Sequence, residues 1–265
     1  MSILSYFIDG IAWLWNNYPE EYMIADKIFW TDFPELENKK KPLKKIYIIG
    51  ELTNSITPSS PKESFILVSL GGQQNPIREG LQENYLALTA KIFEAVSFRT
   101  DKKYIIATGK KASDYLSNIT SSSLVEYISI DHPRMMSLLA KCESFITIGG
   151  QSSTFEAFAS GVKTSFFLPS NLSQAVLQDV FTSGVSWGKY VKVPPVFFTG
   201  SEKYAIDFIE NFSKESLESK IIFDQIVSDI IKNINTEERQ YISLYEKVRK
   251  NGSHDIYQSI LQDLI

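Results

Sequence analysis

The sequence predicts an α/β fold: a Rossmann-like, doubly wound parallel sheet with a helical C-terminal extension and a short aromatic N-terminal segment. From Lys45 onward, short apolar runs alternate with segments of helical periodicity, which is typical of strand–helix–strand repeats. Most runs are apolar throughout, as in parallel strands that helices cover on both faces. Glycines and small polar residues follow several runs, at the end of the strand where such sheets bind ligands.

The expected strands are short and rich in β-branched and aromatic residues. They cover 46–50, 65–70, 104–108, 125–130, 145–148 and 164–168. Apolar residues at three- and four-residue spacing predict the helices between them, over 83–98, 134–141 and 154–160. After Pro195 the pattern is mostly helical, over 205–212, 221–234, a long charged segment through Tyr245, and 254–265.

The N-terminal segment differs from the rest of the chain. Nine of its first 33 residues are aromatic, whereas the whole chain averages 13%. Such an apolar segment should be buried but is too short to form its own core. We expect it to pack on the α/β domain or to cover another chain. The predicted domains are therefore 1–44, a segment that ends in a solvated basic linker, and 45–265.

Composition and charge exclude several classes of protein. With 27 basic and 31 acidic residues the net charge is −4, and we expect no nucleic-acid partner. The single cysteine, Cys142, excludes an intrachain disulfide and a multi-cysteine metal site, and its apolar surroundings indicate a buried side chain. Neither a signal-like segment nor a membrane-spanning run is found, so the expected location is cytoplasmic.

Two loops after expected strands carry candidate ligand contacts. In the loop 70–76, Gly71 and Gly72 let the backbone approach a ligand and Gln73 supplies a neutral donor, although a plain tight turn explains them equally well. In the loop 130–136, His132 is a weak catalytic candidate, and a structural histidine is the alternative.

The segment 146–161 contains the third and most informative loop. Gly149 and Gly150 permit a sharp turn before a helix, whose first N–H groups have no internal partners. The helix then begins with Gln151, Ser152, Ser153 and Thr154. The lysine of a Walker P-loop is absent, so this stretch predicts a cradle for a bound diphosphate. Glu156 could hold a ribose diol beside it, or it could simply complement the helix dipole.

Together these motifs resemble the nucleotide-sugar-binding C-terminal half of GT-B glycosyltransferases of the MurG type and of their cytosylglucuronate-synthase-like relatives. The resemblance covers about 65–181. It implies that the donor diphosphate is bound by Gly150, Gln151, Ser152, Ser153 and Thr154 and the ribose by Glu156. It further implies that Asn171, Ser173 and Gln174 face the donor sugar and that the base lies near Ile130 and Met135. No metal and no cofactor is expected.

A GT-B enzyme has two Rossmann-like domains, and this chain resembles the second with a fragment of the first. The resemblance therefore implies that this chain is the donor-binding half of an inverting hexosyltransferase and that its donor is a UDP-sugar. It also implies that the acceptor site lies on a partner subunit. Whether the chain is an enzyme alone stays open. The alternatives are a non-catalytic binding or scaffold remnant, with the aromatic N-terminus as an oligomer interface, and a sugar-nucleotide epimerase- or hydrolase-like protein.

Overall fold

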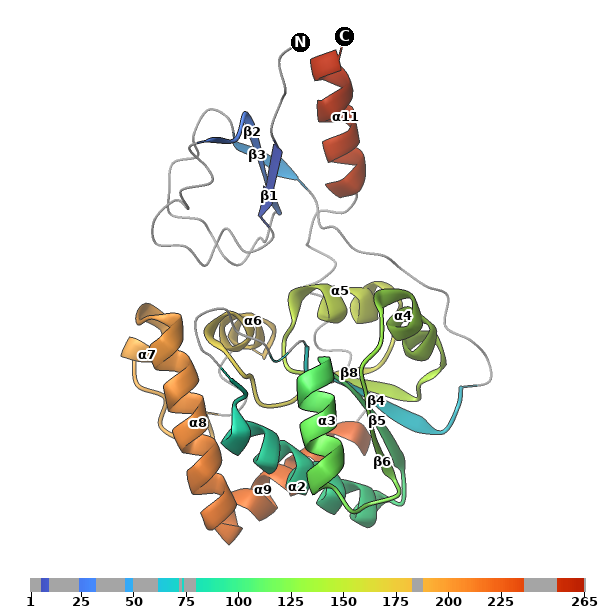
Figure 1. Cartoon of the computed structure of the whole chain (residues 1–265), viewed down its shortest axis with the longest axis vertical. Coiled ribbons are helices and arrows are strands. Elements are labelled where there is room, and N and C mark those ends of the chain that lie inside the picture. Colours follow the sequence, from blue (N-terminus) through green and yellow to red (C-terminus); the bar gives the residue numbers. More distant parts are fainter. Residues whose placement is uncertain are drawn as a thin grey trace. The chain divides into compact units, whose positions relative to one another are not determined.

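The computed structural model describes residues 6–9, 24–31, 46–49, 62–71, 73, 80–182, 188–235 and 252–264. The chain forms two compact units (Figure 1). The larger unit is Ser55–Tyr241, and the smaller combines Met1–Asn54 with Ile242–Ile265. This division differs from the predicted domains, since it joins the two ends of the chain in one unit.

The larger unit contains a five-stranded parallel sheet with the order β6-β5-β4-β7-β8. Its strands are β4 (Phe65–Ser69), β5 (Lys103–Ala107), β6 (Val125–Ile128), β7 (Ser144–Thr147) and β8 (Thr164–Phe166). Numbered within the unit, this is the order 3-2-1-4-5 of a doubly wound sheet, which confirms the predicted fold class. The order reverses between β4 and β7, and a crevice therefore opens at the carboxyl ends of these two strands.

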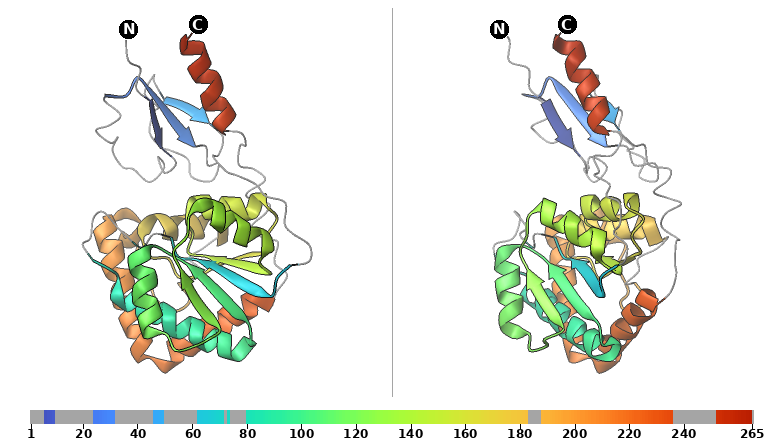
Figure 2. Two further views of the ribbon diagram at one scale, coloured as in Figure 1. Left: turned by 45° about the vertical axis from the view of Figure 1, so that its right-hand side comes forward. Right: turned by 90° about the vertical axis from the view of Figure 1, so that its right-hand side faces the viewer.

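Helices cover both faces of this sheet (Figure 2). Those that follow the strands are α2 (Glu83–Thr100), α3 (Lys110–Ile119), α4 (His132–Lys141), α5 (Gln151–Ala159) and α6 (Leu172–Thr182). The C-terminal extension is α7 (Val196–Thr199), α8 (Glu202–Glu218) and α9 (Lys220–Asn235). The predicted helices are confirmed and are longer than expected, whereas α3, α6 and α7 were not predicted. The charged segment before Tyr245 lies largely outside the described residues.

The core of the larger unit explains why its strands read as continuous apolar runs. Every residue of β4 is buried. Cys142 belongs to the same core cluster as Leu67 and Phe145, and none of the three is exposed. Burial raises the pKa of the Cys142 thiol to about 12, so the thiol is protonated at neutral pH and is a poor nucleophile. The interpretation of Cys142 as a small buried hydrophobe is thus confirmed.

The smaller unit contains a parallel three-stranded sheet with the order β1-β2-β3 and the helix α11 (Gly252–Leu264). The strands are β1 (Tyr6–Asp9), β2 (Lys27–Thr31) and β3 (Ile46–Ile49). Lys27 Nζ donates to Ser259 O at 3.2 Å and Ser259 Oγ at 3.1 Å, and lies 5.0 Å from the centre of the Tyr47 ring. Side-chain contacts therefore connect the sheet to α11.

The placement of β3 corrects the predicted boundary after residue 44. Its run was assigned to the domain 45–265, but it pairs with β2 in the sheet of the smaller unit. An apolar run indicates a strand without indicating its partner, because pairing depends on residues distant in the sequence. Of the N-terminal aromatics, Phe29 has a fully buried side chain within this unit. The role of the whole aromatic N-terminal segment in an oligomer interface stays a prediction.

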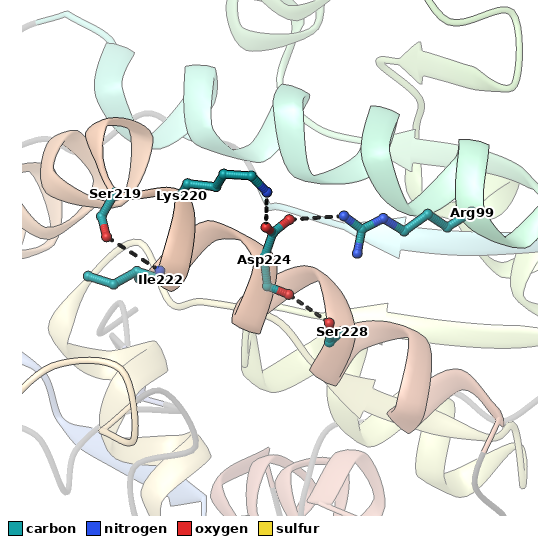
Figure 3. A network of polar contacts seen from close by, with 6 residues as sticks. All are labelled: Arg99, Ser219, Lys220, Ile222, Asp224 and Ser228. Carbon is teal, nitrogen blue, oxygen red and sulfur yellow. Dashed lines mark hydrogen bonds and ion pairs between the residues drawn. The ribbon is translucent and has the colours of Figure 1, made fainter.

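A cluster of charges joins α9 to α2 (Figure 3). Asp224 on α9 lies between Lys220, one helical turn earlier, and Arg99 on α2, whose Nη2 is 2.9 Å from Asp224 Oδ1. Hydrogen bonds from Lys220 and Arg99 hold the pKa of the Asp224 carboxyl below its usual value. Folding therefore favours the ionised carboxylate, and this contribution is present above about pH 4, the range of an unperturbed aspartate, and is lost as the pH falls through the lower folded-state pKa.

We expect Asp224→Asn to lower the thermal unfolding temperature at pH 7 and to have a smaller effect at pH 3. The difference arises because the lost ion pairs exist only while the carboxylate is ionised. The effect at pH 7 should be small, since such exposed pairs contribute little. Thermal unfolding of both proteins across this pH range measures it. Asp114→Asn, which removes an ion pair to Lys110 alone on α3, is the matched control. A deficit that is equal at both pH values would contradict the assignment.

Candidate functional site

A cleft of about 430 Å³ lies at the carboxyl edge of the five-stranded sheet. The ends of β4, β5 and β6 and the N-termini of α4 and α5 form its walls. The described residues that line it are Ser69, Gly71, Ala107, Thr108, Gly109, Ser129, Ile130, Asp131, His132, Met135, Gly150, Gln151, Ser152, Ser153 and Glu156. The cleft thus brings together residues from all three loops that the sequence singled out.

The turn between β7 and α5 presents the start of α5 to the cleft. Gly149 has a φ of +88°, which a residue with a side chain rarely adopts, and Gly150 caps α5 without any side-chain hydrogen bond. Thr154 N donates to Gly150 O at 3.0 Å, so the N–H groups before it have no acceptor within the helix. Gln151, Ser152 and Ser153 line the cleft around these N–H groups. This wall has the geometry of an anion site.

Thr154 does not line the cleft with these three residues, although the resemblance implied that it contacts the diphosphate. Its side chain is fully buried, and its Oγ1 lies 3.4 Å from Thr147 Oγ1 on β7. Thr154 thus packs toward β7, whereas Gln151, Ser152 and Ser153 line the cleft. The structure therefore gives Thr154 a packing role.

Glu156 and His132 meet across the cleft wall. His132 Nε2 lies 2.6 Å from Glu156 Oε1, which is an ion pair when the imidazole is protonated and a hydrogen bond when it is neutral. The Glu156 side chain is 6% exposed and that of His132 is 52% exposed. Asp131 caps α4 by accepting a hydrogen bond from Arg134 N at 2.9 Å, which fixes the start of the helix on which His132 lies. The sequence predicted both residues but not their contact.

Ile130 and Met135 supply the apolar part of the lining. Both are partly buried and pack against the core cluster that contains Leu67 and Cys142. Their side chains therefore form a firmly supported apolar surface next to the His132–Glu156 pair. The structure brings these two predicted base contacts into the same cleft as the start of α5.

The β4 and β5 ends form the opposite wall. Gly71 lines the cleft with a φ of +64°, and its carbonyl accepts hydrogen bonds from Thr108 Oγ1 at 2.9 Å and Gly109 N at 3.2 Å. Thr108 and Gly109 also line the cleft and were not predicted from the sequence. The signal was present, because a small hydroxyl residue and a glycine follow this strand as they follow others.

Several predicted site residues lie elsewhere. Gly72 is outside the described residues. Gln73 is not part of the described lining, and its Nε2 donates to Leu70 O and to Ser170 Oγ. Asn171, Ser173 and Gln174 form a hydrogen-bonded group at the start of α6: Asn171 Oδ1 accepts from Gln174 N and Ser173 Oγ, both at 3.0 Å. Their proposed contact with a donor sugar stays a prediction.

Gln178 on α6 is a structural residue of the site that the sequence did not indicate. Its side chain is fully buried, and its Nε2 donates to Ile148 O at 2.8 Å and to Phe167 O at 2.7 Å. These carbonyls lie just beyond β7 and β8. Gln178 thereby attaches α6 to the chain immediately before the Gly149–Gly150 turn.

Two kinds of feature are absent from the described ranges. No group of three or more His, Cys, Asp or Glu side chains could hold a metal ion. Nor does any described helix have the length and apolar character needed to cross a bilayer.

The fold and the cleft together define a class: a doubly wound α/β unit with a cleft at the carboxyl edge of its sheet. No family model and no curated protein matches the sequence. Among solved structures, the chain is similar to S. aureus TarM at 12% identity and a TM-score of 0.42, covering 92% of this chain and 51% of that one. It is similar to UGT89C1 of Arabidopsis thaliana at 18% identity and a TM-score of 0.43, covering 93% and 66%.

A third similar structure is the UDP-GlcNAc 2-epimerase of Methanocaldococcus jannaschii, at 13% identity and a TM-score of 0.39, covering 54% of this chain and 46% of that one. This chain spans about half to two thirds of the length of the first structures it matches. At these levels the likeness concerns the arrangement of helices and strands and says nothing of ligand or reaction.

Proposed function

We propose that the larger unit binds a nucleoside-diphosphate sugar, with UDP as the nucleotide, and serves as the donor-binding half of an inverting glycosyltransferase. The observation that carries the proposal is a single cleft that combines the uncapped start of α5 with the buried carboxylate of Glu156 and an apolar surface. A nucleoside diphosphate has three parts that require these three surfaces: an anion, a diol and a flat base.

The diphosphate would lie at the start of α5. The free N–H groups there, the hydroxyls of Ser152 and Ser153 and the positive end of the helix dipole all favour an anion. Among the described residues of the lining there is no lysine or arginine. Because charge-assisted hydrogen bonds are roughly twice as strong as neutral ones, we expect a modest affinity for the nucleotide in the isolated chain.

The ribose and the base would lie against the α4 side of the cleft. Glu156 can accept hydrogen bonds from both hydroxyls of a ribose diol, and a buried carboxylate requires such partners. Ile130 and Met135 offer the apolar surface on which a base can lie. The diphosphate and the ribose are adjacent in a nucleotide, as the start of α5 and Glu156 are adjacent on one helix.

The reaction would need a second site. An acceptor hydroxyl attacks the anomeric carbon with inversion, its proton passes to a base, and the nucleoside diphosphate leaves. The start of α5 would stabilise the charge that develops on the leaving diphosphate. We propose that the acceptor and the base are supplied by a partner subunit, and that the aromatic N-terminal segment takes part in that association.

Replacing Glu156 by alanine should weaken UDP binding by about 1.5–3 kcal/mol, or about 10- to 150-fold, because a charge-assisted hydrogen bond to the ribose is lost. Isothermal titration calorimetry with UDP, GDP, CDP and dTDP measures this loss and the nucleotide preference together. Titrations with and without Mg²⁺ should agree, since the proposal involves no metal.

Two variants make the result specific. Glu143→Gln removes a half-exposed carboxylate that pairs with Lys102 at the start of β7, and should leave the affinity unchanged. Ser153→Phe should abolish binding by filling the cleft at the start of α5. Unchanged affinity of the Glu156→Ala protein for UDP would mean that Glu156 does not contact the nucleotide and only complements the dipole of α5. No binding of any nucleotide would instead favour the scaffold alternative.

A further inference from the structure

His132 contacts the carboxylate of Glu156 on the lining of the cleft. Its Nε2 lies 2.6 Å from Glu156 Oε1, within the cleft that both residues line. The Glu156 side chain is only 6% exposed, so little of its carboxylate is open to solvent. An imidazole on this oxygen and a ribose hydroxyl on the same oxygen compete for one hydrogen-bonding position.

We propose that His132 is a displaceable partner of Glu156: it satisfies the carboxylate in the free protein and leaves it when the ribose diol binds. This inference rests on the proposed function. It adds His132 as a residue that sets the affinity of the site for the nucleotide and its preference for ribose over deoxyribose. The His132–Glu156 contact competes with the ribose for the carboxylate. The free-energy cost of breaking this contact therefore lowers the affinity for the nucleotide.

The burial of the two side chains decides which of them moves. Glu156 lies within α5 and is flanked by Phe155 and Ala157, which are 1% and 0% exposed. His132 is the first residue of α4, and half of its side chain is already exposed. Rotating the imidazole into solvent therefore disturbs little packing, whereas moving Glu156 would disturb the core.

The same contact satisfies the buried carboxylate of Glu156 in the free protein. A buried carboxylate without a partner is strongly unfavourable. His132 supplies a donor when no ligand is bound, and two ribose hydroxyls would supply two donors in the complex. A 2′-deoxyribose offers one of these two, so it compensates less well for the loss of His132. The inference thus predicts a preference for ribonucleotides that depends on Glu156.

Nuclear magnetic resonance can follow the displacement directly, because the chain has only two histidines. His254, on α11 in the smaller unit, is an internal reference. On addition of UDP at constant pH, the imidazole signals of His132 should shift toward their positions in the free Glu156→Ala protein, while those of His254 stay fixed. Binding of UDP without any such shift would overturn the inference and leave the proposed function intact.

Calorimetry provides the second test. His132→Ala should bind UDP about tenfold more tightly than the unmodified chain, which corresponds to about 1.4 kcal/mol. The gain should disappear when His132→Ala is made in the Glu156→Ala background, and the control His254→Ala should show no gain. If His132→Ala lowers the thermal unfolding temperature, His132→Asn serves as the second variant, since its shorter side chain also vacates the Nε2 position.

The remaining outcomes separate the two claims. Weaker or unchanged binding by His132→Ala, with UDP bound by the unmodified chain, would overturn the competition alone. No binding of UDP by any of these variants would overturn the proposed function and the inference with it.

Discussion

Replacing Gly149 by alanine is expected to lower the free energy of unfolding of the larger unit by about 2–5 kcal/mol. Two effects add. The φ of +88° is unfavourable for any residue with a side chain, by roughly 1–2 kcal/mol. A Cβ atom would also lie 2.8 Å from Gln174 O and 3.0 Å from Gln178 Cγ, and overpacking of this kind typically costs about 1–3 kcal/mol. Urea denaturation measures the change.

The chain offers a matched control at Gly161, which joins α5 to β8. Its φ is +65°, and no described atom lies within 4 Å of the position of an added Cβ. Gly161→Ala should therefore cost only the conformational part, roughly 1–2 kcal/mol. Gly149→Ala should in addition weaken UDP binding, because the start of α5 would shift. Equal losses of stability in the two variants would show that contact of the added Cβ with α6 contributes nothing to the cost at position 149.

The second large effect is expected at Gln178. Gln178→Met keeps the volume and removes both donors, which leaves the carbonyls of Ile148 and Phe167 buried without that partner. An unsatisfied buried group costs about 1–3 kcal/mol, so for two carbonyls we expect a loss of about 2–6 kcal/mol in the free energy of unfolding. Denaturation in urea at neutral pH again measures it.

A comparison with Gln82 tests the cause. Gln82 is also buried, but its Nε2 donates to the single carbonyl of Ser170 at 3.0 Å. Gln82→Met should therefore cost at most half as much as Gln178→Met, because it also removes Gln82 Oε1, which is buried without a hydrogen-bond partner. Only the latter should also reduce UDP affinity, since Gln178 is bound to the residue before the Gly149–Gly150 turn. A Gln178→Met protein as stable as the unmodified chain would mean that these carbonyls find other donors.

The central strands β4 and β7 could be predicted because every residue in them is buried, and such continuous burial is visible in the sequence as an unbroken apolar run. Helix α3 was missed although its sequence carries the signal, because Ala112, Tyr115, Leu116 and Ile119 recur at three- and four-residue spacing. The pairing of β3 with β2, by contrast, was beyond prediction. An apolar run records that a strand is buried but not which neighbour covers its edge.

For the site, the loops could be predicted and the contacts could not. Glycine turns after strands indicated Gly71 and the start of α5, because these need backbone freedom at a defined place. The contact of His132 with Glu156 depends on how α4 and α5 are rotated about their axes, and loop sequence does not set that rotation. Gln178 escaped notice for a related reason: a buried amide within a helix resembles an ordinary polar residue until its acceptors are known.

The bond between Lys27 and Ser259 has a consequence for the order of events during synthesis. The two residues are 232 positions apart in the chain. At a translation rate of about 5–20 residues per second, Ser259 is added roughly 10–50 s after Lys27. The whole of the larger unit is made in that interval and can fold first. The smaller unit can therefore complete its contacts with α11 only after its neighbour in the chain has had time to fold.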